Sequence, residues 1–187
     1  MQAPVTDKDK VKKDTFDIGC FGAIRPLKNQ LIQAMAAIEF VRGWDRQLNF
    51  HINSSRVETG GEPVLKNLRA LFNEYPGAVL VENDWMELDV FLSFLRSNID
   101  MGLQVSLSET WNHVTANCVQ AGIPVVGSKE ISWLDKESMS EPTNVDSIVS
   151  AMEYALDRKN QVLRNQKLLV KASSKAQLAW LEFAKKV

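Results

Sequence analysis

The chain has 187 residues, of which 45% are hydrophobic and 24% charged, a balance typical of a globular protein rather than a disordered chain. Its 22 lysines and arginines against 23 aspartates and glutamates give a net charge of −1, which argues against a basic nucleic-acid binder. No apolar run reaches the roughly 18 to 20 residues that span a bilayer, and the polar N-terminal segment lacks the apolar core of a signal peptide. The two cysteines are too few for a disulfide framework, so we expect a reduced, cytoplasmic protein.

Short apolar runs alternate with segments of helical periodicity along the chain. Residues 1–15 are charged and aperiodic, so we expect a flexible tail before a single domain over residues 16–187. The apolar runs predict buried strands at 16–22, 48–52, 78–81, 101–107 and 123–127. Apolar residues at helical spacing predict helices at 29–43, 64–72, 88–95, 114–120, 145–156 and 167–185.

This alternation of strands and helices predicts the α/β class, with a parallel sheet that is covered by helices on both faces. Right-handed crossovers would make it a Rossmann-like, doubly wound domain. Such a fold binds ligands at the carboxyl ends of its strands. The polar and glycine residues of the chain concentrate at these ends, in segments 22–28, 53–56, 82–85, 106–112 and 127–133.

The first of these segments contains Gly22, Arg25 and Lys28. A glycine after a strand lets backbone N–H groups approach a phosphate, and the two cations could neutralise it. The spacing fits neither the dinucleotide pattern G-x-G-x-x-G nor the P-loop. A tight turn with two solvated cations explains the same residues, and the pattern leaves both interpretations open.

The fourth segment places Glu109 between a strand end and the start of a helix. A carboxylate there can accept hydrogen bonds from sugar hydroxyls, and the free N–H groups of the helix can bind phosphate or hydroxyl oxygens. Ordinary capping by Ser108 or Thr110 is the alternative that the pattern alone favours.

Metal and nucleophile chemistry have little support in the sequence. His51 and His113 have no partners at metal-ligand spacing. We expect His51 to be structural, because it lies within a strand pattern, and Cys20 to be a buried, inert thiol. His113 follows Glu109 by one helical turn and could face either way.

Taken together, residues 16–135 resemble the C-terminal, donor-binding domain of GT-B glycosyltransferases, and most of all the retaining family 4 and glycogen-synthase-like group. The family motif G-R-L-x-x-x-K-G corresponds to residues 22–29, where Gly22 and Lys28 are kept and Arg25 would replace the arginine that is missing at position 23. The family's E-x7-E signature begins at Glu109, but its second glutamate falls at Asn117. The ending A-G-x-P-V is matched at residues 121–125.

The resemblance implies a site for a nucleotide-diphosphate-sugar. Arg25 and Lys28 would neutralise the diphosphate, and Glu109 would bind a sugar hydroxyl; these three are the catalytic candidates. Asn117 would contact the ribose in place of the glutamate. The remaining donor-binding candidates lie on the loops around the site: Gly22, Asn53, Trp85, Thr110, Trp111, Asn112 and His113. GT-B enzymes usually work without a metal, so neither a metal nor another cofactor is expected.

GT-B enzymes have two Rossmann-like domains, and this chain has the length of one. We therefore expect the donor half of a glycosyltransferase, to be completed by an N-terminal acceptor domain or a partner subunit. A stand-alone nucleotide-sugar-binding module and a degenerate scaffold remain alternatives. In the last predicted helix, Leu178, Trp180, Leu181 and Phe183 would mark the surface that the missing half covers, or would pack on the domain's own sheet.

Overall fold

The fold is built on a parallel six-stranded sheet in the order β3-β2-β1-β4-β5-β6. It was obtained as a computed structural model, which describes residues 14–157 and 159–185. The predicted tail therefore lies outside the described residues, apart from its last two positions, and Thr15 already begins β1. The strands are β1 (Thr15–Gly19), β2 (Gln47–Asn53), β3 (Ala78–Asn83), β4 (Met101–Gln104), β5 (Val125–Ser128) and β6 (Met139–Ser140).

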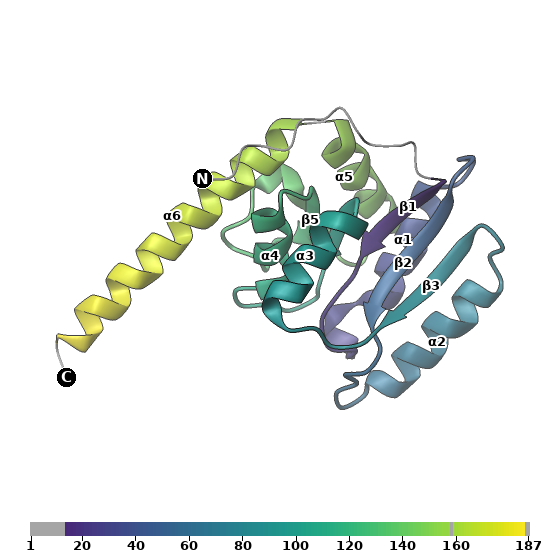
Figure 1. Cartoon of the computed structure of the whole chain (residues 1–187), viewed down its shortest axis with the longest axis horizontal. Helices are drawn as coiled ribbons and strands as arrows, with labels where there is room; N and C mark the ends of the chain where they lie inside the picture. Colours follow the sequence, from purple (N-terminus) through teal and green to yellow (C-terminus); the bar gives the residue numbers. More distant parts are fainter. Residues whose placement is uncertain (1–13, 158, 186–187) are drawn as a thin grey trace.

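Helices cover both faces of this sheet, as the alternating pattern predicted (Figure 1). One core cluster joins the sheet to α1 (Gln30–Phe40), α2 (Gly61–Asn73) and α5 (Val145–Asp157). A second cluster lies on the other face, under α3 (Leu88–Asn98), α4 (His113–Ala121) and the first half of α6 (Lys159–Ala184). Two short 3-10 helices, Pro26–Lys28 and Lys136–Ser138, complete the described elements.

The central strands are apolar because a parallel sheet is buried on both faces. Ile18, Leu48, Phe50, Met101 and Leu103 are fully buried in β1, β2 and β4. The strand order changes direction between β1 and β4, which pair in parallel at Ile18 and Met101. This position is the topological switch point at which doubly wound sheets open a crevice for a ligand.

Most predicted elements differ from the observed ones by a few residues at one or both ends, and three strands illustrate this. β4 ends at Gln104 rather than at residue 107, because the N–H of Val105 donates to the side chain of Gln33 (2.7 Å) instead of a strand. β5 begins after Pro124, which has no N–H to donate to the ladder. The predicted strand over 16–22 ends at Gly19, and the residues after it form a loop.

Two elements were missed or misplaced by the sequence patterns. β6 has only two residues and carries no apolar run that could predict it. α6 begins at Lys159 rather than near 167, and its first turns are anchored by Gln161, which bonds both the N–H and the carbonyl of Val125 (3.4 and 2.9 Å). The final helix is therefore longer than its apolar pattern indicates.

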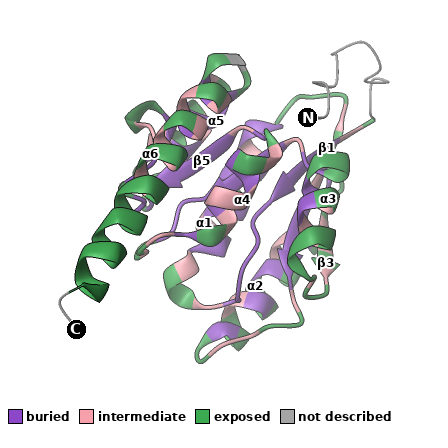
Figure 2. Ribbon diagram, turned by 60° about the vertical axis from the view of Figure 1, so that its left-hand side comes forward, coloured by how far each residue is buried: buried purple, intermediate pink, exposed green. Residues whose placement is uncertain are grey.

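The second half of α6 extends away from the sheet domain (Figure 1), and its residues are exposed (Figure 2). Trp180 is 71% exposed, and Leu178, Leu181 and Phe183 are also exposed. Of the two alternatives for these side chains, packing on the domain's own sheet is therefore wrong. Within the described residues, no helix combines the length and apolar character needed to cross a membrane.

Gly61 lets α2 pack closely against the loop that follows β1. A Cβ atom at this position would lie 2.1 Å from the carbonyl oxygen of Ile24, which itself accepts a hydrogen bond from Glu58 N (3.0 Å). Because the obstacle is backbone that is held in place, Gly61→Ala should lower the free energy of unfolding by about 1–3 kcal/mol. Denaturant unfolding measures this change.

Gly77→Ala is the matched control. No atom lies within 4 Å of a Cβ there, and the residue does not have a positive φ, so its unfolding midpoint should equal or slightly exceed that of the wild type. If the two variants were equally stable, the close approach of α2 would not limit the fold.

Candidate functional site

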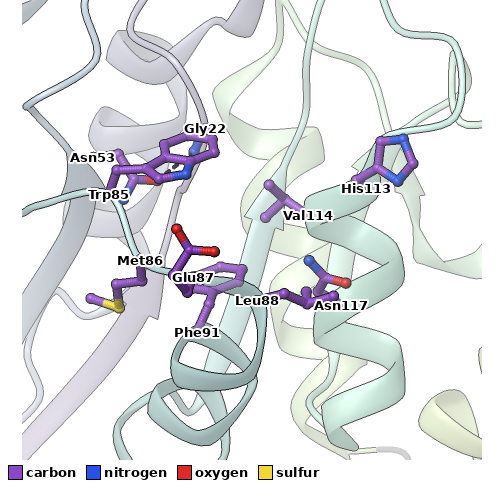
Figure 3. Close-up of a pocket in the computed structure, with 10 residues that line it drawn as sticks. All are labelled: Gly22, Asn53, Trp85, Met86, Glu87, Leu88, Phe91, His113, Val114 and Asn117. Atoms are coloured by element: carbon purple, nitrogen blue, oxygen red, sulfur yellow. Dashed lines mark hydrogen bonds between the residues drawn. The ribbon is translucent and has the colours of Figure 1, made fainter.

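A pocket of about 240 Å³ opens at the carboxyl ends of the strands, beside the switch point (Figure 3). Its walls come from four separate segments: the loop after β1, the end of β2, the β3–α3 connection and the start of α4. The lining residues are Gly22, Asn53, Trp85, Met86, Glu87, Leu88, Phe91, His113, Val114 and Asn117. Five of the predicted site residues thus lie together: Gly22, Asn53, Trp85, His113 and Asn117.

Buried side-chain amides hold the walls of this pocket in place. Asn53 Oδ1 accepts a hydrogen bond from the N–H of Gly22 (2.9 Å), and its Nδ2 donates to the carbonyl of Asp84 (3.2 Å). Gln104 Nε2 donates to the carbonyl of Phe21 (3.1 Å), and its Oε1 accepts from Asn112 Nδ2 (3.3 Å). Each amide uses both its N–H and its oxygen to link two segments, so the pocket walls are held together without a buried charge.

Gly22 has a conformation and a position that favour glycine. Its φ of 112° lies in the region that L side chains rarely adopt. A Cβ at Gly22 would stand 3.7 Å from Lys28 Cε and 4.0 Å from Val114 Cγ2. Gly22 therefore lies between the pocket and the side chain of Lys28.

Lys28 and Glu109 form an ion pair directly behind Gly22. Lys28 Nζ bonds Glu109 Oε1, and their side chains are only 13% and 6% exposed. Neither residue lines the pocket itself, but the pair connects the loop after β1 with the loop between β4 and α4. An ammonium has three N–H donors, so Lys28 can bind a further anion while it holds Glu109.

Arg25 points to a different neighbour. Its guanidinium pairs with Glu58 (3.2 Å), which also accepts a hydrogen bond from Arg56 (2.9 Å). Arg25 does not line the pocket. The two cations that the sequence placed together thus pair with different acidic residues.

The residues after Glu109 divide into structural and pocket-lining members. Thr110 is exposed, and Trp111 packs against Trp133, whose Nε1–H donates to the Trp111 carbonyl (2.7 Å). Asn112 is buried and caps α4, since its Oδ1 accepts from the N–H of Thr115 (2.9 Å). Capping thus belongs to Asn112 rather than to Ser108 or Thr110, and of these four residues after Glu109 only His113 reaches the pocket.

Trp85 presents a large aromatic surface at the pocket mouth. The indole is 56% exposed, its backbone N–H donates to Ser55 Oγ (3.0 Å), and the Arg56 guanidinium stands 5.0 Å from the ring centroid. A planar ligand could stack on such a ring.

Five lining residues were not predicted from the sequence: Met86, Glu87, Leu88, Phe91 and Val114. Leu88 and Phe91 were assigned to the apolar face of α3, yet Leu88 is 57% exposed. Their position directly after Trp85, at the start of a helix that follows a strand end, is the signal that could have identified them.

His51 and Cys20 are structural, as expected. His51 is buried and its Nε2 lies 2.9 Å from Asp17 Oδ1. Burial raises the pKa of the Cys20 thiol to about 12, which leaves it uncharged. Among the described residues, no group of three or more histidines, cysteines and acidic residues is arranged to hold a metal ion.

Comparison with known proteins identifies the fold. No family model and no curated protein matches the chain. It is similar to the structure of E. coli trehalose-6-phosphate synthase bound with UDP-2-fluoroglucose, with a TM-score of 0.72 at 14% identity, over 93% of this chain and 45% of that one. A UDP-forming trehalose-phosphate synthase from Burkholderia vietnamiensis gives a TM-score of 0.72 at 11% identity, over 93% and 46%.

These neighbours are GT-B glycosyltransferases. The chain has the fold of one half of a GT-B enzyme. It spans less than half the length of the structures that it resembles. At these identities the likeness concerns the fold alone, so the functional residues must be argued from the site.

The Asp17–His51 pair predicts an acid-sensitive contribution to stability. Burial raises the pKa of Asp17, but hydrogen bonds from His51, Asn49 and Thr15 outweigh it and lower the pKa from 3.8 to about 2. A carboxylate with a lowered pKa stabilises the fold above its unfolded pKa, and this contribution is lost as the pH falls from about 4 to about 2.

Asp17→Asn should therefore cost about 2 kcal/mol of unfolding free energy at neutral pH and make the stability less dependent on pH between 4 and 2. Urea unfolding at several pH values measures both effects, with the exposed Asp45→Asn as control. An Asp17→Asn variant with the pH dependence of the wild type would show that the pair does not stabilise the fold.

Proposed function

We propose that this chain is the donor-binding half of a glycosyltransferase. It would bind a nucleotide-diphosphate-sugar, and an N-terminal domain or a partner subunit would supply the acceptor site. The observation that carries the proposal is the pocket at the switch point of a GT-B half-fold, with Trp85 at its mouth and the Lys28–Glu109 pair behind Gly22. The kept motif residues Gly22, Lys28 and Glu109 support a relation to the family 4 and glycogen-synthase-like group.

The pocket has room for part of such a donor. Small-molecule sites have volumes of roughly 300–1,000 Å³, and this pocket, at about 240 Å³, lies below that range. We therefore assign it to the nucleoside, with the base against Trp85. The diphosphate would extend past Gly22, whose missing side chain leaves the approach to Lys28 open.

Lys28 and Glu109 would then contact the two groups that the breaking bond joins, the diphosphate and the sugar. Two N–H donors of Lys28 remain for phosphate oxygens while the third holds Glu109. As the sugar leaves, negative charge develops on the diphosphate, and a fixed ammonium stabilises it without rearrangement. The start of α4 at His113 and Val114 adds the positive end of a helix dipole on the same side. Glu109 would accept a hydrogen bond from a sugar hydroxyl.

We propose metal-independent binding, in which Lys28 Nζ and the N-terminus of α4 contact the diphosphate oxygens. Arg25 could add a second cation only if it left Glu58, and Thr110, Trp111 and Asn112 would shape the loop rather than touch the donor.

The exposed outer half of α6 fits the missing half of the enzyme. Leu178, Trp180, Leu181 and Phe183 would be covered by the domain that completes the cleft. The chain covers 45% of the E. coli neighbour, and the rest of that neighbour is long enough to contain a second domain.

Calorimetric titration with UDP-, GDP- and ADP-glucose, without added metal, tests the proposal. At least one should bind, and its affinity should exceed that of the matching nucleoside diphosphate, because Glu109 holds the sugar. In Glu109→Gln the two affinities should become equal within about twofold, while the diphosphate alone binds as before within a few-fold.

Asp135→Asn is the control for Glu109→Gln, because it also removes one partner of an ion pair, with Arg164 (2.7 Å), but outside the pocket. It should leave every affinity unchanged. Failure of all three nucleotide sugars to bind would overturn the proposal in favour of a degenerate scaffold.

A further inference from the structure

Glu87 is the acidic residue that lines the pocket, and none of the interactions described above involves its carboxylate. It directly precedes α3 at the N-cap position, but its side chain makes no capping hydrogen bond. Its backbone carbonyl is used, since it accepts from the N–H of Phe91 (2.8 Å). Glu87 is exposed, and no side chain within residues 14–157 and 159–185 forms a hydrogen bond or an ion pair with its carboxylate.

The carboxylate is directed into the pocket, on the side of Trp85 (Figure 3). Asn117 lines the same pocket from α4, and the apolar side chains of Phe91 and Leu88 line it from α3. Four polar side chains line the pocket: Asn53, whose amide holds the walls, His113 at the start of α4, and Glu87 and Asn117. Of these, Glu87 and Asn117 enter the pocket from the start of α3 and from α4. One accepts hydrogen bonds only, and the other both donates and accepts.

This pair matches the chemistry of adjacent hydroxyl groups. A carboxylate has two oxygens that can accept from two neighbouring O–H groups, and such charge-assisted hydrogen bonds are stronger than neutral ones. Each hydroxyl also has lone pairs, which the amide N–H groups of Asn117 can satisfy. In a nucleoside, the 2′- and 3′-hydroxyls of ribose form the only such adjacent pair.

We propose that Glu87 recognises the ribose hydroxyls of the nucleotide, with Asn117 as its partner on the opposite wall. The inference rests on the proposed nucleotide site and assigns the residue that makes it selective for ribonucleotides. Glu87 binds and positions the nucleotide and takes no part in bond breaking.

The test compares the affinities of UDP and 2′-deoxy-UDP by calorimetry, with the ADP and GDP pairs in parallel. Wild-type protein should bind the ribonucleotide about 10-fold more tightly, the loss expected for one hydrogen bond to a charged group. Glu87→Gln should weaken ribonucleotide binding about 10-fold and reduce the preference over the deoxy form to about twofold or less.

Asp89→Asn is the matched control, because it removes a carboxylate from the first turn of the same helix outside the pocket. It should keep the wild-type affinity and preference. In the double variant Glu87→Gln with Asn117→Glu, a carboxylate returns from the opposite wall, and the preference for ribose should return with it.

The outcomes separate this inference from the proposed function. If no nucleotide binds to the wild type, the proposed function fails and the assignment of Glu87 fails with it. If nucleotides bind but Glu87→Gln keeps the ribose preference, only the assignment is overturned. A change of preference among UDP, ADP and GDP with an unchanged ribose preference would overturn it too, since Glu87 would then contact the base.

Discussion

The site depends on one hydrogen-bonded side chain, the buried amide of Asn53. Its oxygen holds the N–H of Gly22 and its nitrogen holds the carbonyl of Asp84, so a single residue at the end of β2 joins the loops that follow β1 and β3. Gln104 does the same for the loop after β1 and the start of α4. Amides can tie loops together in this way without the desolvation cost of a buried charge. Trp85, Glu87, His113 and Asn117 come together because these loops are held.

The charges near the site are arranged in pairs around this neutral framework. Lys28 and Glu109 hold each other behind Gly22, and Arg25 holds Glu58 farther away. Glu87 differs from them, since it faces the pocket without a partner among the described residues. A ligand with a phosphate at one end and hydroxyl groups at the other would engage both kinds of group. This division between a paired and an unpaired carboxylate is the chemical basis of the proposed donor site.

Much of the fold could be predicted because its elements carry their own periodic signals. Strands such as β2 and helices such as α3 alternate clearly in the sequence, and a parallel sheet follows from that alternation. The bounds of β4 and β5 were less predictable. β4 ends where the N–H of Val105 donates to Gln33, which is 72 residues away in the sequence, and β5 begins after Pro124, which has no N–H. β6 is too short to have a pattern at all.

The candidate site was predictable to the extent that its residues follow strand ends. Gly22, Asn53, Trp85, His113 and Asn117 do lie together. The pairing of Arg25 with Glu58 was not foreseen, because partners 33 residues apart are matched only by the folded chain. Glu87 was missed because an exposed acidic residue before a helix is usually explained by the helix dipole, and only the pocket shows where its carboxylate points.

The central claim is that a nucleoside diphosphate binds with its phosphates at Lys28 and its ribose between Glu87 and Asn117. A crystal structure of the protein in complex with the nucleoside diphosphate that it binds tests this directly. The account predicts a phosphate oxygen within hydrogen-bonding distance of Lys28 Nζ, the base against Trp85 and the ribose hydroxyls at the Glu87 carboxylate. A nucleotide bound outside this pocket, or inside it with its phosphates away from Lys28, would contradict the account.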